Sequence, residues 1–180
     1  MHEGDGCASS LVFLVGFMGA GKTSVGQALS RSFGWSFEDL DDLVVARQRR
    51  SIEQIFRDSG AAAFRHAEHQ ALRELLAHKR SHHCVVALGG GAYAEPEIAA
   101  LIEQSGSTVI FLDAPVDVLL KRCEQQSVVR PLRRDPEQFR SLYEARRPHY
   151  MKASFRVETS GKTIDQVSRE IASKLGSRSL

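Results

Sequence analysis

The chain has 180 residues, of which 42% are hydrophobic and 26% are charged. This length is sufficient for one domain with a proper core and too short for two ordinary domains. The net charge of +2 does not indicate a nucleic-acid-binding surface, and no apolar run approaches the ~18 residues of a membrane-spanning helix. The composition therefore favours a cytoplasmic protein that binds neither nucleic acid nor membranes.

The first ten residues, MHEGDGCASS, have neither a basic start nor an apolar centre. They do not resemble a secretory signal, and we expect a short disordered lead-in at 1–10 followed by a single domain over 11–176. The three cysteines are far apart and form no C-x-x-C pair. This spacing argues against a disulfide framework and against a cysteine zinc site.

Short β-rich runs alternate with longer helical stretches along the whole chain. The runs are mostly apolar throughout, which is typical of strands that are buried on both faces. They lie at 11–15, 35–37, 84–88, 107–112 and 154–158. The alternation predicts an α/β fold, a mostly parallel sheet with helices on both faces, and ligand binding beyond the carboxyl ends of the strands.

Several helices carry start signals. Ser51 with Gln54, and Thr163 with Gln166, form capping-box patterns ahead of helical stretches. Pro96, Pro115 and Pro136 each stand where a first helical turn would begin.

The segment GFMGAGKT, 16–23, follows the first predicted strand and matches G-x-x-x-x-G-K-[ST] in full. Glycines allow backbone N–H groups to turn onto phosphate oxygens, and the following helix adds its N-terminal partial charge. Lys22 can reach the β- and γ-phosphates, and the Thr23 hydroxyl can ligate Mg²⁺. The match and its context predict a nucleotide triphosphate site.

FEDLDDL, 37–43, follows the second predicted strand. If the chain stays extended there, Asp39 and Asp41 point to the same side, toward the phosphate loop. Such carboxylates can hold Mg²⁺ through water or accept a proton from an attacking hydroxyl. The alternative is that one of these aspartates only caps the next helix.

Four later features are weaker signals when each is taken alone. Arg65 lies in a helical stretch, where an arginine is usually surface charge. LGGGA, 88–92, permits close ligand approach to the backbone, although a plain turn also uses glycine. Arg130 precedes a proline in a polar loop, and Arg146 stands near the end of the next helix.

Between Lys121 and Lys152, nine Lys or Arg residues stand against four Asp or Glu residues. This basic excess can bind an anion or can form a solvated surface.

The ordered set GFMGAGKT, FEDLD, FR, LGGGA, RPL and RRPHY resembles the shikimate kinase family from about 11 to 175. The resemblance implies a three-layer α/β/α P-loop kinase fold with a five-stranded parallel sheet of order 2-3-1-4-5. It also implies a substrate-binding region at about 39–75 and a mobile lid at about 124–136.

The resemblance also implies roles for the acceptor residues. Asp41 matches the carboxylate that binds shikimate hydroxyls and is the candidate base. Arg65 and Arg146 match the arginines that hold the shikimate carboxylate, and Gly89, Gly90 and Gly91 match the glycine loop that faces the substrate. A planar guanidinium suits this bidentate recognition of a carboxylate.

On the nucleotide side, Thr23 and Asp39 match the Mg²⁺ site, with Asp39 acting through water. Catalytic roles fall to Lys22 and Arg130, the latter as the lid arginine that closes over the phosphates. Adenine is expected near Arg122 and Ile164. The nucleotide-binding residues are therefore expected to be Gly19, Ala20, Gly21, Lys22, Thr23, Ser24, Arg122, Arg130 and Ile164.

Two positions depart from the family pattern. Ala61 replaces a glutamate that often follows the glycine before the substrate arginine, so any support from that glutamate must be absent or come from elsewhere. Arg133 stands in the fourth place of the lid motif, where leucine is common. Lid closure or nucleotide affinity is therefore expected to differ.

We expect a monomer that transfers the ATP γ-phosphoryl group to the 3-hydroxyl of shikimate, with Mg²⁺ as cofactor and ATP and shikimate as partners. One alternative is a kinase for another small hydroxy acid such as gluconate. The other is a nucleotide-binding protein of this fold without catalysis.

Overall fold

The structure is a computed structural model that describes residues 11–78, 82–125 and 135–176. The predicted lead-in at 1–10 and nearly all of the predicted lid lie outside these residues, so both stay predictions. Within the three described ranges, no helix is long and apolar enough to cross a membrane.

The five strands form one sheet in the order β2-β3-β1-β4-β5, and every neighbouring pair is parallel. The predicted sheet order is thus confirmed. The strands are β1 Leu11–Val15, β2 Ser36–Asp39, β3 Cys84–Ala87, β4 Thr108–Asp113 and β5 Phe155–Glu158. Each predicted run agrees with a strand to within two residues at either end.

The central strands are apolar throughout because helices cover both of their faces. All five residues of β1 and all four residues of β3 are buried, and Phe13 and Leu14 have no exposed surface.

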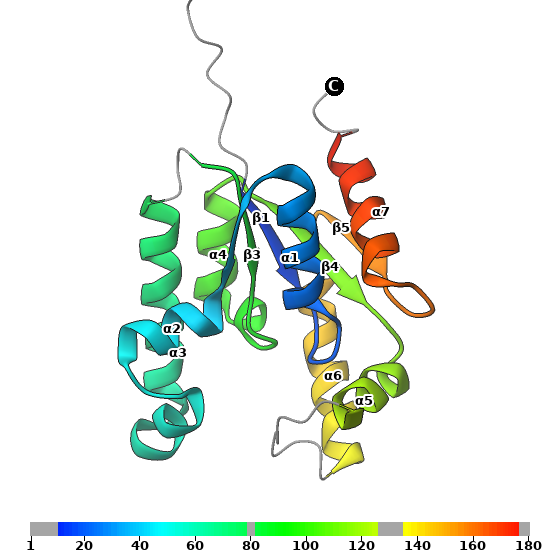
Figure 1. Cartoon of the computed structure of the whole chain (residues 1–180). Coiled ribbons are helices and arrows are strands. Elements are labelled where there is room, and N and C mark those ends of the chain that lie inside the picture. Colours follow the sequence, from blue (N-terminus) through cyan, green and yellow to red (C-terminus); the bar gives the residue numbers. More distant parts are fainter. Residues whose placement is uncertain (1–10, 79–81, 126–134, 177–180) are drawn as a thin grey trace, which may run out of the picture.

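The helices complete three layers (Figure 1). α1 lies in front of the sheet and packs against α7, whereas α4 and α6 lie behind the sheet. The helical bounds are α1 Lys22–Phe33, α2 Leu40–Gln48, α3 Ile52–His78, η1 Ala92–Ala94, α4 Pro96–Gln104, α5 Val116–Gln125, α6 Pro136–Tyr150 and α7 Ile164–Gly176.

The two predicted capping boxes are confirmed by their hydrogen bonds. The backbone N–H of Ser51 donates to Gln54 Oε1 at 2.8 Å, and the N–H of Gln54 donates back to Ser51 Oγ at 3.1 Å. Thr163 and Gln166 form the same reciprocal pair ahead of α7. These bonds satisfy donors that a helix leaves unpaired in its first turn.

One local prediction needs correction. The chain is not extended through Asp41, because β2 ends at Asp39 and α2 begins at Leu40. The predicted helical context of Arg65 is confirmed, and α3 consists of two helical segments that meet at a kink at Gly60, with φ 80° and ψ 177°. A positive φ of this size favours glycine, so the chain bends there without strain.

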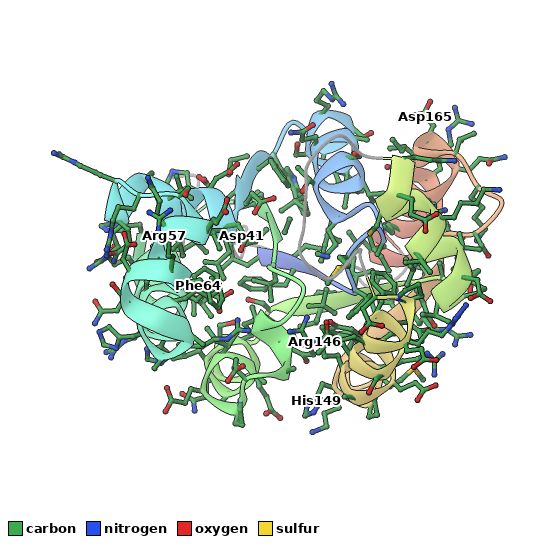
Figure 2. The ribbon with its side chains drawn as sticks, turned by 90° about the horizontal axis from the view of Figure 1, so that it is seen from below. Asp41, Arg57, Phe64, Arg146, His149 and Asp165 are labelled. Atoms are coloured by element: carbon green, nitrogen blue, oxygen red, sulfur yellow. The ribbon has the colours of Figure 1, made fainter. Side chains whose placement is uncertain are left out.

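Because all five strands run in parallel, their carboxyl ends meet at one edge, which is the lower edge in Figure 1. The loop after β1 with the first turn of α1, the first turn of α2, and the loop after β3 carry most of the predicted site residues to this edge. Figure 2 looks onto it from below, with Asp41 and Phe64 toward one side and Arg146 nearer the centre.

Candidate active site

The loop after β1 is shaped by glycines that need positive φ. Gly16, Gly19 and Gly21 have φ values of 146°, 81° and 90°. A Cβ on Gly16 would lie 2.5 Å from the carbonyl oxygen of Leu112, and a Cβ on Gly19 would lie 2.8 Å from that of Leu119. The turn therefore depends on glycine both for conformation and for space.

Lys22 begins α1 directly after this loop. Its ammonium donates to the carbonyl oxygens of Gly16 at 2.8 Å and Phe17 at 3.0 Å, so the side chain folds back over the loop. An ammonium held there lies beside the helix N-terminus, where anions bind favourably.

Thr23 and Asp39 meet where β2 ends. Thr23 Oγ1 donates to Asp39 Oδ2 at 2.9 Å, while Asp39 Oδ1 accepts from the N–H of Asp41 and caps α2. Asp39 therefore caps α2, as the alternative interpretation proposed, and it also lies beside Thr23 at the phosphate loop. A hydroxyl and a carboxylate oxygen are hard ligands of the kind that Mg²⁺ prefers.

These two oxygens are too few for an all-protein metal cage. Across the described ranges, no group of three or more His, Cys, Asp or Glu side chains is arranged to hold a metal ion. This donor set fits Mg²⁺ in phosphoryl transfer, where substrate phosphates and water supply most of the ligands.

Six of the nine predicted nucleotide-binding residues line one cavity of about 410 Å³, which Lys22 and Thr23 do not line. Arg122 crosses it from α5, donating to the carbonyl oxygen of Thr159 at 2.8 Å and to Thr159 Oγ1 at 3.0 Å. Ile164 lies on the far rim and is 47% exposed. The cavity is lined on the loop side by Gly19, Ala20, Gly21 and Ser24.

The acceptor side is built around the glycine loop after β3. A Cβ on Gly89 would lie 2.7 Å from Asp41 Oδ1 and 3.1 Å from Glu68 Oε1, so two carboxylate oxygens face this backbone. Asp41 reaches this place from the first turn of α2. The extended conformation expected for Asp41 is therefore wrong, and its role toward the acceptor stays a prediction.

Two guanidinium groups converge on the next part of the loop. A Cβ on Gly91 would lie 2.7 Å from Arg65 Nη2 and 2.9 Å from Arg146 Nη2. Arg146 Nη1 also donates to the carbonyl oxygen of Gly90 at 3.3 Å. Two guanidinium nitrogens side by side make a site for a carboxylate.

Tyr150 anchors the same loop from below. Its side chain has no exposed surface, and its hydroxyl donates to the carbonyl oxygen of Gly90. Burial raises the pKa of the Tyr150 phenol, so the hydroxyl keeps the proton that it donates.

Glu68 is a site residue that the sequence reasoning missed. It has no exposed surface, one oxygen pairs with Arg65 Nη1, and the other, Oε1, has no hydrogen-bond partner. Burial raises the pKa of its carboxyl from 4.5 to about 7, although Arg65 opposes the change. Its position three residues after Arg65 on the helix was the available signal.

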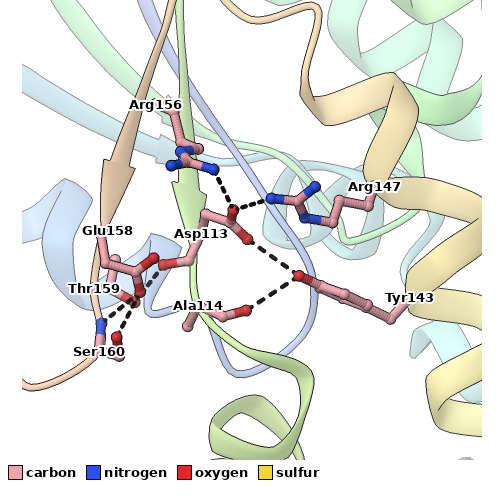
Figure 3. Close-up of polar contacts among 8 residues, drawn as sticks. All are labelled: Asp113, Ala114, Tyr143, Arg147, Arg156, Glu158, Thr159 and Ser160. Atoms are coloured by element: carbon pink, nitrogen blue, oxygen red, sulfur yellow. Dashed lines mark hydrogen bonds and ion pairs between the residues drawn. The ribbon is translucent and has the colours of Figure 1, made fainter.

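Asp113, at the end of β4, is the centre of a polar cluster (Figure 3). Its carboxylate accepts from Arg147 Nη2 at 2.8 Å, Arg156 Nη1 at 3.4 Å and the Tyr143 hydroxyl at 3.3 Å. This buried carboxylate ties α6 to the sheet and so helps to place Arg146. Arg147, which belongs to the basic stretch between Lys121 and Lys152, is therefore ion-paired rather than only solvated.

The remaining predicted positions divide into two groups. Arg130 and Arg133 lie outside the described residues, so the lid roles stay predictions. Ala61, one residue after the Gly60 interruption, is exposed on α3.

The chain matches the family model "Shikimate kinase" over residues 18–176. It is 37% identical to a shikimate kinase of Chlorobium chlorochromatii, covering 92% of this chain and 90% of the relative. It is 40% identical to one of Geobacter sulfurreducens, covering 89% and 88%.

Solved structures show the same relationship. Shikimate kinase from Aquifex aeolicus is 36% identical with a TM-score of 0.83, covering 94% of this chain and 98% of that one. Shikimate kinase from Acinetobacter baumannii, solved in complex with shikimate, is 29% identical with a TM-score of 0.83 and covers 96% of each chain. With its sheet order, phosphate loop and paired arginines, the chain belongs to the shikimate kinase family, whose members are ATP-dependent phosphotransferases.

Proposed function

We propose that this protein transfers the γ-phosphoryl group of ATP to the 3-hydroxyl of shikimate, giving shikimate 3-phosphate and ADP. One observation carries the acceptor assignment. Carboxylate oxygens of Asp41 and Glu68 face Gly89, while guanidinium nitrogens of Arg65 and Arg146 face Gly91. Hydroxyl-binding and carboxylate-binding groups thus lie two residues apart on one loop, as a small hydroxylated ring acid requires.

On the donor side, the loop N–H groups and Lys22 bind the phosphates, and adenine lies near Arg122 and Ile164. Thr23, and Asp39 through water, would hold Mg²⁺, which would neutralise charge at the phosphate oxygens. Arg130 is proposed to add positive charge from the lid when it closes.

On the acceptor side, Arg65 and Arg146 bind the shikimate carboxylate and so fix the orientation of the ring. The 3-hydroxyl then lies beside Asp41, which accepts its proton as the oxygen attacks. The new bond joins this oxygen to the γ-phosphorus, and the bond from that phosphorus to the bridging oxygen of ADP breaks. Exclusion of water by the closed lid prevents hydrolysis of ATP in place of transfer.

A coupled ADP-release assay with shikimate, with gluconate and with no acceptor tests this function. We expect saturable ADP release with shikimate and only background release in the other two reactions. Equal release with and without shikimate would refute the proposal, and release with gluconate alone would favour the other small-acid kinase. We further propose a monomeric, cytoplasmic enzyme, which sedimentation and cell fractionation test.

A further inference from the structure

Arg65 is held by two carboxylates that come from different parts of the fold. Glu68, on the same helix, pairs with Nη1. Glu95, which follows η1 and precedes α4, places Oε1 3.1 Å from Nε. Glu68 is fully buried, whereas the Glu95 side chain is 42% exposed.

The two contacts decide which part of the guanidinium remains for a ligand. With Nε beside Glu95 and Nη1 beside Glu68, the third nitrogen, Nη2, lies against Gly91. Arg146 brings its own Nη2 to the same glycine. The Nη2 atoms of Arg65 and Arg146 therefore lie together beside Gly91.

Glu95 does not act as a helix cap, although it occupies the N-cap position of α4. Its side chain makes no capping hydrogen bond. Serine, threonine, aspartate and asparagine are the residues that cap well there, and an exposed ion pair adds little to stability. The Glu95 side chain thus forms an ion pair with Arg65 and does not cap α4.

We propose that Glu95 is a positioning residue for acceptor recognition, which holds the Arg65 guanidinium so that Nη2 faces the acceptor carboxylate beside Arg146. The inference rests on the proposed function. An arginine side chain has several rotatable bonds, and ordering it at the moment of binding weakens affinity. Glu95 orders Arg65 before the acceptor arrives.

The test is the variant Glu95→Ser, which removes the contact to Arg65 and supplies a better N-cap. We expect the shikimate KM to rise about threefold to tenfold, because Arg65 must then be ordered on binding. The ATP KM and kcat should stay within about twofold, and the melting temperature should not fall, because serine caps the helix. A purely structural role for Glu95 would instead lower the melting temperature.

Glu97→Ser is the matched control for the lost charge. Glu97 lies in the first turn of the same helix with a side chain that is 82% exposed. We expect its shikimate KM to stay within about twofold of wild type, since it has no ion pair with Arg65.

A double-mutant cycle with Arg65→Lys isolates the route of the effect, because lysine has no guanidinium for Glu95 to orient. We expect Glu95→Ser to cause no further rise in KM in that background. An unchanged or lowered KM in Glu95→Ser, an equal rise in Glu97→Ser, or an undiminished effect in the Arg65→Lys background would overturn the inference. Absence of shikimate-dependent turnover in the wild type would instead refute the proposed function itself.

Discussion

The donor half and the acceptor half of the site are built in different ways. The phosphate-binding part of the donor half is one continuous turn, in which Gly16, Gly19 and Gly21 shape the backbone and Lys22 folds over it. The acceptor half is assembled from side chains that come from α2, α3 and α6 and meet over Gly89–Gly91. A phosphate can be held mainly by backbone N–H groups, whereas a particular hydroxy acid needs charged side chains at chosen distances.

The largest expected effect separates catalysis from binding within the acceptor half. Asp41→Asn removes the proposed proton acceptor while keeping its shape. We expect kcat to fall about 10³-fold, with a much smaller change in the ATP KM. Asp42→Asn, one residue further on and exposed, is the control and should retain most of its activity. Near-normal kcat in Asp41→Asn would remove this residue from the chemistry.

Two glycine substitutions sharpen the contrast between the halves. In Gly16→Ala the new Cβ meets the backbone oxygen of Leu112 at φ 146°, so we expect a loss of about 3 kcal/mol in the free energy of unfolding. In Gly91→Ala the three atoms nearest to the new Cβ belong to the ends of the Arg65 and Arg146 side chains, which can move. Stability should then change by less than about 1 kcal/mol while the shikimate KM rises about tenfold.

Urea unfolding of both variants measures the change in the free energy of unfolding, and steady-state kinetics measure the shikimate KM. Gly176→Ala is the control, because nothing lies within 4 Å of its new Cβ. Similar losses of stability at positions 16 and 91 would show that the glycine loop of the acceptor half is as rigid as the phosphate loop.

The acceptor half also carries a buried titratable carboxylate. The pKa of Glu68 is raised from 4.5 to about 7 by burial, so the folded state holds this proton more tightly than the unfolded state. The contribution of Glu68 to stability is therefore fully present below pH 4.5 and is lost as the pH rises through about 7. The loss amounts to about 3 kcal/mol, at roughly 1.4 kcal/mol per tenfold change in proton affinity.

Unfolding free energies of the wild type and Glu68→Gln between about pH 4 and pH 8 measure this loss. The difference between the two proteins should move in favour of the glutamine variant as the pH rises. Glu53→Gln, an exposed position on the same helix, is the control. A difference that stays constant across this range would mean that Glu68 does not titrate in the folded protein there.

The same contrast explains what could be predicted from the sequence. A contiguous motif such as GFMGAGKT contains its own geometry, and buried parallel strands are recognisable as apolar runs, so the sheet and the donor half were predictable. The glycine loop and the two arginines were recognised through the ordered set of motifs rather than through any one of them.

Most of the contacts that the sequence did not predict are long-range. Glu95 and the Asp113 cluster depend on which elements pack together, and no local spacing encodes that. Glu68 is different, because it stands three residues after Arg65 and so had a local signal. Asp41 shows a different case, because α2 begins one residue before it and its carboxylate lies against Gly89. The fold brought it there by a helical turn instead of an extended strand.

The central claim is that donor and acceptor are bound by separate sets of residues, and calorimetric titration of two variants tests it most directly. Arg65→Ala should raise the Kd of shikimate about 30-fold and leave the Kd of a non-hydrolysable ATP analogue within about twofold. Lys22→Ala should show the reverse pattern. Equal weakening of both ligands by Arg65→Ala would contradict the division of the site into two halves.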